Sequence, residues 1–133
     1  MDDDLINRIK FSGRILTRVC YELSKAAGWH DDPKTGFPRS PEENEAMFPV
    51  RIALCHSELS EALEGHRKHL MDDHLPHRHM AEVELADVAI RVFDLAGAMG
   101  YDLGEAIAEK LAYNSERADH KKEARQATHG KRY

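Results

Sequence analysis

Cysteine and tryptophan are scarce in this sequence, and long hydrophobic runs are missing. Its two cysteines, Cys20 and Cys55, lie in apolar stretches without Cys-x-x-Cys spacing, which favours buried free thiols over a disulfide or a thiolate metal site. No apolar segment approaches the length of a membrane span. The acidic start at residues 2–4 has the wrong charge for a signal or transit peptide. The sequence therefore predicts a cytoplasmic protein with no membrane partner.

Positive charge is also in short supply, because 19 Lys and Arg stand against 24 Asp and Glu, a formal net charge of −5. Duplex nucleic acid needs a basic face, so this balance argues against such a partner. No glycine-rich phosphate-binding loop is present, and no Glu has a His three residues later, which excludes the di-iron pattern of helical bundles. With 41% hydrophobic and 32% charged residues, the 133-residue chain has the composition of one globular domain.

The predicted fold is all-α, because apolar residues recur at helical spacing and no stretch alternates with period two for the length of a strand. Prolines and glycine make residues 29–49 mostly loop, with a short helix capped by Ser40. The main helices are predicted over residues 5–27, 50–70, 79–99 and 102–126. We therefore expect one domain over residues 1–133, made of a leading helix and variable loop (1–49), catalytic helices (50–126) and a tail (127–133).

The second predicted helix carries an acidic row, Glu58, Glu61 and Glu64, beside an apolar stripe. Residues three apart lie along one side of a helix, where like charges repel by a few tenths of a kcal/mol (~0.3). Such a row at the edge of a buried face favours a bound cation. A solvated acidic face is the alternative.

The third predicted helix is apolar on nearly all sides, with its polar residues confined to one narrow stripe. A helix of this kind is buried in a core or a subunit interface, so we expect a homodimer or a dimer of dimers. Glu84 and Asp87, three residues apart in the stripe, would be costly to bury unless paired or bound to metal. As an alternative, Arg91 could neutralise Asp87 one turn away.

Packed together, these two helices would supply four carboxylates to one site: Glu58, Glu61, Glu84 and Asp87. Oxygen ligands without His or Cys suit Mg²⁺ or Mn²⁺ rather than zinc. A bound metal ion would lower the pKa of a coordinated water and so activate it as a nucleophile. The general base is left open among these carboxylates, Glu58 and Glu61 included, and Glu64.

The fourth predicted helix changes from apolar to basic along one face. After apolar positions in residues 103–107, the same line continues with Lys110, Asn114, Arg117 and Lys121. This arrangement predicts a cavity that holds an anion, whose charge the cations would offset. A polar helix end whose cations complement the helix dipole is the alternative.

In their order, these motifs resemble the MazG-like, all-α nucleoside triphosphate pyrophosphohydrolases, which include dCTP pyrophosphatases, dimeric dUTPases and phosphoribosyl-ATP pyrophosphohydrolase. The resemblance covers roughly residues 51–133 and rests on Glu58-x-x-Glu61, Glu84-x-x-Asp87, Lys110-x-x-x-Asn114-x-x-Arg117 and the 129–133 tail. It implies a four-helix MazG-like bundle completed by oligomerisation. It also implies attack at the α-phosphorus of a nucleoside triphosphate, releasing monophosphate and pyrophosphate. In such proteins, the region equivalent to residues 1–49 is where base recognition often varies.

Other features admit further interpretations. The loop aromatics Trp29, Phe37 and Phe48 could stack on a base, although isolated aromatics are more often core residues.

A histidine-rich stretch is interpreted as a solvated turn rather than a zinc site. Two other classes of protein stay open: a non-catalytic helical interaction protein, and a metal-sensing or metal-storing protein that uses these histidines. The histidines concerned are His66, His69, His74, His77 and His79.

Overall fold

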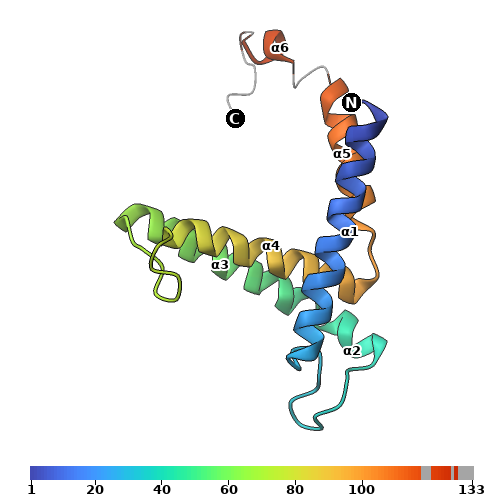
Figure 1. Cartoon of the computed structure of the whole chain (residues 1–133), viewed down its shortest axis with the longest axis vertical. Helices are drawn as coiled ribbons and strands as arrows, with labels where there is room; N and C mark the ends of the chain where they lie inside the picture. The colour runs from blue at the N-terminus through green and yellow to red at the C-terminus, as the bar shows by residue number, and fades with distance from the viewer. Residues whose placement is uncertain (118–120, 127, 129–133) are drawn as a thin grey trace. The chain divides into compact units, whose positions relative to one another are not determined.

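The computed structural model describes residues 1–117, 121–126 and 128, and this part of the chain is mostly helical (Figure 1). It contains no strand, only two isolated bridges, so the all-α prediction is confirmed. The chain forms two compact units: the hairpin unit, residues 15–101, and the terminal unit, residues 1–14 with the described part of 102–133. The helices are α1 (Asp3–Ala26), α2 (Pro41–Ala46), α3 (Phe48–Lys68), α4 (Met80–Met99), α5 (Leu103–Glu116) and α6 (Lys122–Gln126).

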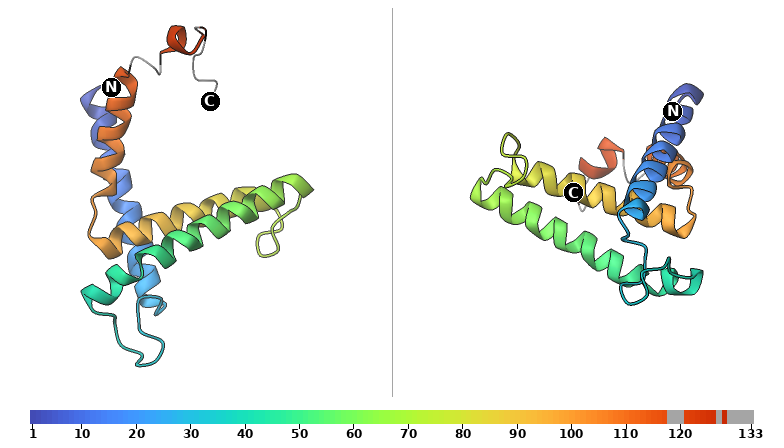
Figure 2. Two further views of the ribbon diagram at one scale, coloured as in Figure 1. Left: turned by 180° about the vertical axis from the view of Figure 1, so that it is seen from behind. Right: turned by 60° about the horizontal axis from the view of Figure 1, so that its bottom comes forward.

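The hairpin unit is built on α3 and α4, which lie side by side and antiparallel (Figures 1 and 2). They approach closely where Gly65 faces Met80, since a Cβ at Gly65 would lie 2.9 Å from the Met80 side chain. The turn between them begins at His69, which caps α3 in the left-handed conformation (φ 53°). Buried Asp72 then accepts hydrogen bonds from the backbone N–H groups of His74 and Leu75. This local order fixes the register of α4 against α3.

The loop before α3 is held by its own hydrogen bonds. Asp32 accepts from the N–H groups of Lys34 and Thr35, and its own N–H donates to the carbonyl of Phe37. The short helix α2 follows with the predicted capping box. Ser40 accepts from the N–H of Glu43, whose carboxylate accepts from the N–H of Ser40.

In the terminal unit, the first half of α1 lies side by side with α5 (Figures 1 and 2). The two backbones nearly touch, because a Cβ on Gly13 would lie 2.5 Å from the Cα of Gly104. Asp102 caps α5 as predicted and accepts from the N–H of Glu105. The Glu105 carboxylate pairs with Lys10 and Arg14 on α1.

One sequence-based boundary is wrong. A single fourth helix over residues 102–126 was expected, whereas α5 ends at Glu116 and Arg117 is extended (ψ 126°). A separate short helix, α6, begins at Lys122. The physical reason is that residues 114–123 contain one alanine and otherwise polar residues, so a helix there has no apolar face to bury.

Much apolar surface of the hairpin unit is uncovered within the chain. On α3, Leu59 and Leu63 are exposed, and on α4 so are Leu85, Ile90 and Val92. The third predicted helix is thus apolar on many sides, as its sequence indicates, but several of those sides face outward. Among the described residues, no helix is both long and apolar enough to cross a membrane. The buried apolar residues are few and mostly small: Cys55, Ala62, Leu95, Ala96 and Ala108.

Candidate metal centre

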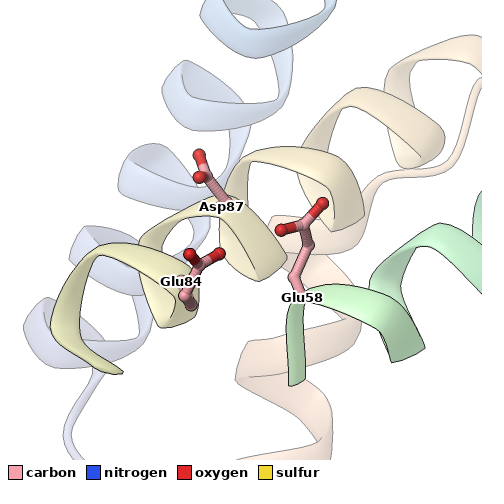
Figure 3. A group of neighbouring side chains, drawn as sticks. All are labelled: Glu58, Glu84 and Asp87. Carbon is pink, nitrogen blue, oxygen red and sulfur yellow. The ribbon is translucent and has the colours of Figure 1, made fainter. Parts of the chain in front are cut away.

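Three carboxylates from two helices converge inside the hairpin unit (Figure 3). Glu84 and Asp87 lie on the face of α4 that meets α3, and Glu58 projects from α3 toward them. Each offers an oxygen, and these oxygens all lie within 4.8 Å of one another. We call Glu58, Glu84 and Asp87 the acidic triad. The sequence predicted all three members. Spacing of three places Glu84 and Asp87 on one helical face, and Glu58 belongs to the acidic row of the preceding helix.

Burial and the repulsion of neighbouring carboxylates oppose ionisation of two members of the triad, Glu84 and Asp87. Glu58 and Glu84 are each 8% exposed. Burial raises the pKa of Glu84 to about 7, with a hydrogen bond to Glu58 and the negative charges of Glu61, Glu58 and Asp87 acting in the same direction. Burial and the charge of Glu58 also raise the pKa of Asp87. A site that holds this much negative charge favours a proton or a metal ion.

Arg91 supplies positive charge to the triad from α4. Its Nε donates to Oε1 of Glu58 at 2.8 Å, and its Nη2 forms an ion pair with the same oxygen at 2.6 Å. The alternative pairing suggested by the sequence, Arg91 with Asp87 one turn away, is therefore replaced by an ion pair across the two helices. Sequence spacing within one helix could not reveal that contact.

The donor set fits Mg²⁺ or Mn²⁺. All three groups are carboxylates, the hard oxygen ligands these ions prefer, and no His or Cys belongs to the group. Within the described residues, no second set of three or more potential ligands is close enough to hold a metal, so the five histidines of residues 66–79 do not form such a group. The solvated interpretation of that stretch agrees with their exposure.

The structure places the other predicted acidic residues differently. Glu61 is exposed on α3 and is not part of the triad, although its charge contributes to the raised pKa of Glu84. Glu64 pairs instead with Lys68 at 2.5 Å and with Arg67 at 3.4 Å. Of the two, Glu61 is the carboxylate that acts electrostatically on the triad.

The predicted substrate-binding residues belong to the terminal unit. Lys110 and Arg117 lie over the ring of Tyr113, 4.8 and 5.9 Å from its centroid. Asn114 has a buried Oδ1 that accepts no hydrogen bond from the described residues, a feature that suits a ligand donor. Lys121 is exposed just before α6. The substrate-binding role of these four residues stays a prediction.

A second buried polar cluster was missed by sequence reasoning. His30 is 5% exposed, and its Nε2 lies 2.7 Å from Oδ1 of Asp94. Arg51 Nη2 lies 3.0 Å from His30 Nδ1, and since a guanidinium only donates, Nδ1 accepts and Nε2 carries the proton to Asp94. Ser24 donates to the other oxygen of Asp94. This cluster ties the loop to α1, α3 and α4, leaving Trp29 and Phe37 outward, 76% and 73% exposed.

Comparison with known proteins gives no match: no protein-family model, no curated protein and no solved structure matches the chain. The functional assignment therefore rests on the residues and geometry of the chain itself and on the motif resemblance described above.

The raised pKa of Glu84 gives the metal-free protein a defined pH dependence. The native state holds this proton up to about pH 7, whereas the ordinary pKa of a glutamate in the unfolded chain is 4.5. The stability that this proton confers is therefore complete below the unfolded pKa and is lost as the pH rises through the native one. We expect a loss on the order of 1 kcal/mol between about pH 5 and pH 8, smaller than the full pKa difference implies because solvent screens part of the charge repulsion. Chemical denaturation of parent and Glu84→Gln across this range measures it, and equal slopes would contradict the assignment.

Proposed function

We propose that this chain is a cytoplasmic, Mg²⁺-dependent nucleoside triphosphate pyrophosphohydrolase that produces a monophosphate and pyrophosphate. The observation that carries the proposal is the acidic triad, three convergent carboxylates on two helices, of which Glu84 and Asp87 have raised pKa values. The ordered motifs that resemble MazG-like enzymes give the reaction class. A phosphoribosyl-ATP substrate is the variant of the same chemistry left open by that resemblance.

In this proposal, Glu58, Glu84 and Asp87 hold the metal, and Glu61 completes the ligand set or serves as the base. When bound, the ion offsets phosphate charge and lowers the pKa of a coordinated water. Glu61 is the better placed of the base candidates, since Glu64 is engaged by Lys68 and Arg67. It would accept the proton of the attacking water. Lys110, Arg117 and Lys121 would neutralise the phosphates, and Asn114 would hydrogen-bond phosphate or sugar.

The direct test is pyrophosphate release from each common nucleoside triphosphate and from phosphoribosyl-ATP, with and without Mg²⁺. We expect hydrolysis of at least one substrate with Mg²⁺ or Mn²⁺ and complete loss in excess EDTA, because the donor set is all carboxylate. Readdition of Mg²⁺ after EDTA is the control for irreversible damage. Full activity in excess chelator would exclude the proposed metal chemistry, and a folded protein with no turnover would favour a non-catalytic helical protein.

A MazG-like bundle completed by a second copy of the chain, as a homodimer or homotetramer, is part of the proposal. The exposed apolar residues of α3 and α4, Leu63 and Leu85 among them, are the surface that a second copy would cover. We expect light scattering at micromolar concentration to give a dimer or tetramer. Leu85→Lys should shift the population toward monomer, whereas the exposed Leu23→Lys on α1 serves as the matched control. A well-folded parent monomer would contradict this arrangement.

A further inference from the structure

The two residues of the Arg91–Glu58 ion pair differ in how far their side chains are exposed to solvent. The Glu58 side chain is 11% exposed, whereas that of Arg91 is 41% exposed. Without a cation, Glu58 would be a nearly buried charge with no counter-ion, which is strongly unfavourable. Arg91 can instead turn toward water at little cost, because a partly exposed guanidinium keeps much of its hydration. Glu58 therefore needs a cation, but the cation need not be Arg91.

Arg91 also acts on a second member of the triad. Burial and the charges of Glu58 and Asp72 raise the pKa of Asp87, whereas the charge of Arg91 lowers it. Both of its contacts are to Oε1 of Glu58, the carboxylate nearest to Arg91 in the triad. A dication coordinated to Glu58 and a guanidinium on the same oxygen would repel strongly at such a short separation.

We propose that Arg91 is the internal counter-cation of the metal-free site, and that it gives up Glu58 when metal binds. This inference rests on the proposed function, because it takes the acidic triad as a metal site. Arg91 is thus a positioning residue. It keeps Glu58 turned toward the triad before loading, and it weakens the affinity for free metal because each binding event must break its ion pair.

The test uses Mn²⁺ as the probe, with binding followed by electron paramagnetic resonance on the parent and Arg91→Met. The variant should bind Mn²⁺ about tenfold more tightly or better, because no guanidinium competes for Glu58. Its metal-free form should melt about 4 °C lower, and Mn²⁺ should close that gap. Arg78→Met is the matched control: it removes the same charge and an ion pair with Glu82, and its affinity should stay within about twofold of the parent. Unchanged or weaker binding by Arg91→Met would overturn the proposal.

A second measurement uses the intact protein and does not depend on how well Arg91→Met folds. The Nε–H of Arg91, donating to Glu58 at 2.8 Å, should give a slowly exchanging ¹⁵N signal, assigned by its absence in Arg91→Lys. Saturating Mg²⁺ should accelerate its exchange by about tenfold or more as the ion pair opens. A signal unchanged at saturation would show that Arg91 stays on Glu58 and would overturn the exchange.

The two proposals fail in different ways. If the parent binds Mn²⁺ and hydrolyses a nucleotide while Arg91→Met binds no more tightly, the counter-cation role alone is excluded. If neither protein binds Mn²⁺ at millimolar concentration and no nucleotide is hydrolysed, the metal site and the role of Arg91 are excluded together. Binding by Arg91→Met but not by the parent would support the exchange most strongly.

Discussion

Glu84→Gln is expected to lower nucleotide hydrolysis by at least about a thousandfold while leaving the metal-free protein as stable as the parent or more stable. The amide keeps the shape of the side chain but removes a metal ligand, so turnover falls. It also removes a carboxylate whose ionisation is opposed by burial and by three neighbouring acids, so at pH 8 the variant should gain on the order of 1 kcal/mol. Pyrophosphate release and urea denaturation in the presence of EDTA measure the two effects.

Glu58→Gln is the matched comparison, because the same chemical change should move stability in the opposite direction. It removes the carboxylate that binds Arg91, and the partly exposed ion pair should cost about 1 kcal/mol when broken. Activity should fall as in Glu84→Gln. If both amides destabilised the metal-free protein and retained activity, these acids would serve the fold, and the enzyme proposal would lose its main support.

Gly13→Ala is expected to destabilise the terminal unit by about 1–3 kcal/mol, against the usual direction of a glycine-to-alanine change in a helix. Alanine in a helix interior normally gains about 1 kcal/mol over glycine. Here, however, the new Cβ would lie 2.5 Å from the Cα of Gly104, which is backbone and cannot rotate away. The two helices must separate, which also loosens the ion pairs of Arg14 with Asp102 and Glu105. Thermal unfolding with hydrogen exchange on α5 measures the loss.

Ser12→Ala is the control for that change, since Ser12 is exposed on the same helix and its replacement adds no contact with α5. It should shift the melting temperature little or raise it slightly. A Gly13→Ala variant more stable than the parent would mean that α1 and α5 do not approach through their glycines.

Local signals in the sequence were sufficient for most of the helical framework. The capping box at Ser40, the Asp102 cap and the glycine after Met99 each act within a few residues, so their outcome is encoded nearby. The triad was predictable for a similar reason, since the three-residue spacing of Glu84 and Asp87 fixes a shared face. The end of α5 could not be predicted because polar residues continue at helical spacing along the face on which the apolar residues end. These residues are Lys110, Asn114, Arg117 and Lys121.

What could not be predicted depends on contacts between distant segments. Arg91 lies four residues after Asp87, yet it binds Glu58, 33 positions earlier in the chain, because the packing of α4 on α3 decides which carboxylate it meets. His30 and Asp94, 64 positions apart, gave no local signal beyond the polar stripe of α4 that contains Asp94. Asp72 lies among polar residues between the second and third predicted helices, and no local signal there distinguishes its side chain, which is buried as the acceptor of two N–H groups.

In the loop over residues 29–40, the side chains that anchor the loop are different from the aromatic side chains that are exposed to solvent. His30 is anchored to Asp94 and Arg51, and the Asp32 carboxylate accepts two backbone N–H groups in the loop, whereas the side chains of Trp29 and Phe37 point outward and take part in neither contact. Substitutions at the two aromatic positions should therefore be tolerated by the fold far better than a change at His30. New side chains at positions 29 and 37 would therefore change the chemistry of this exposed surface while the contacts of His30 and Asp32 that hold the loop stay in place.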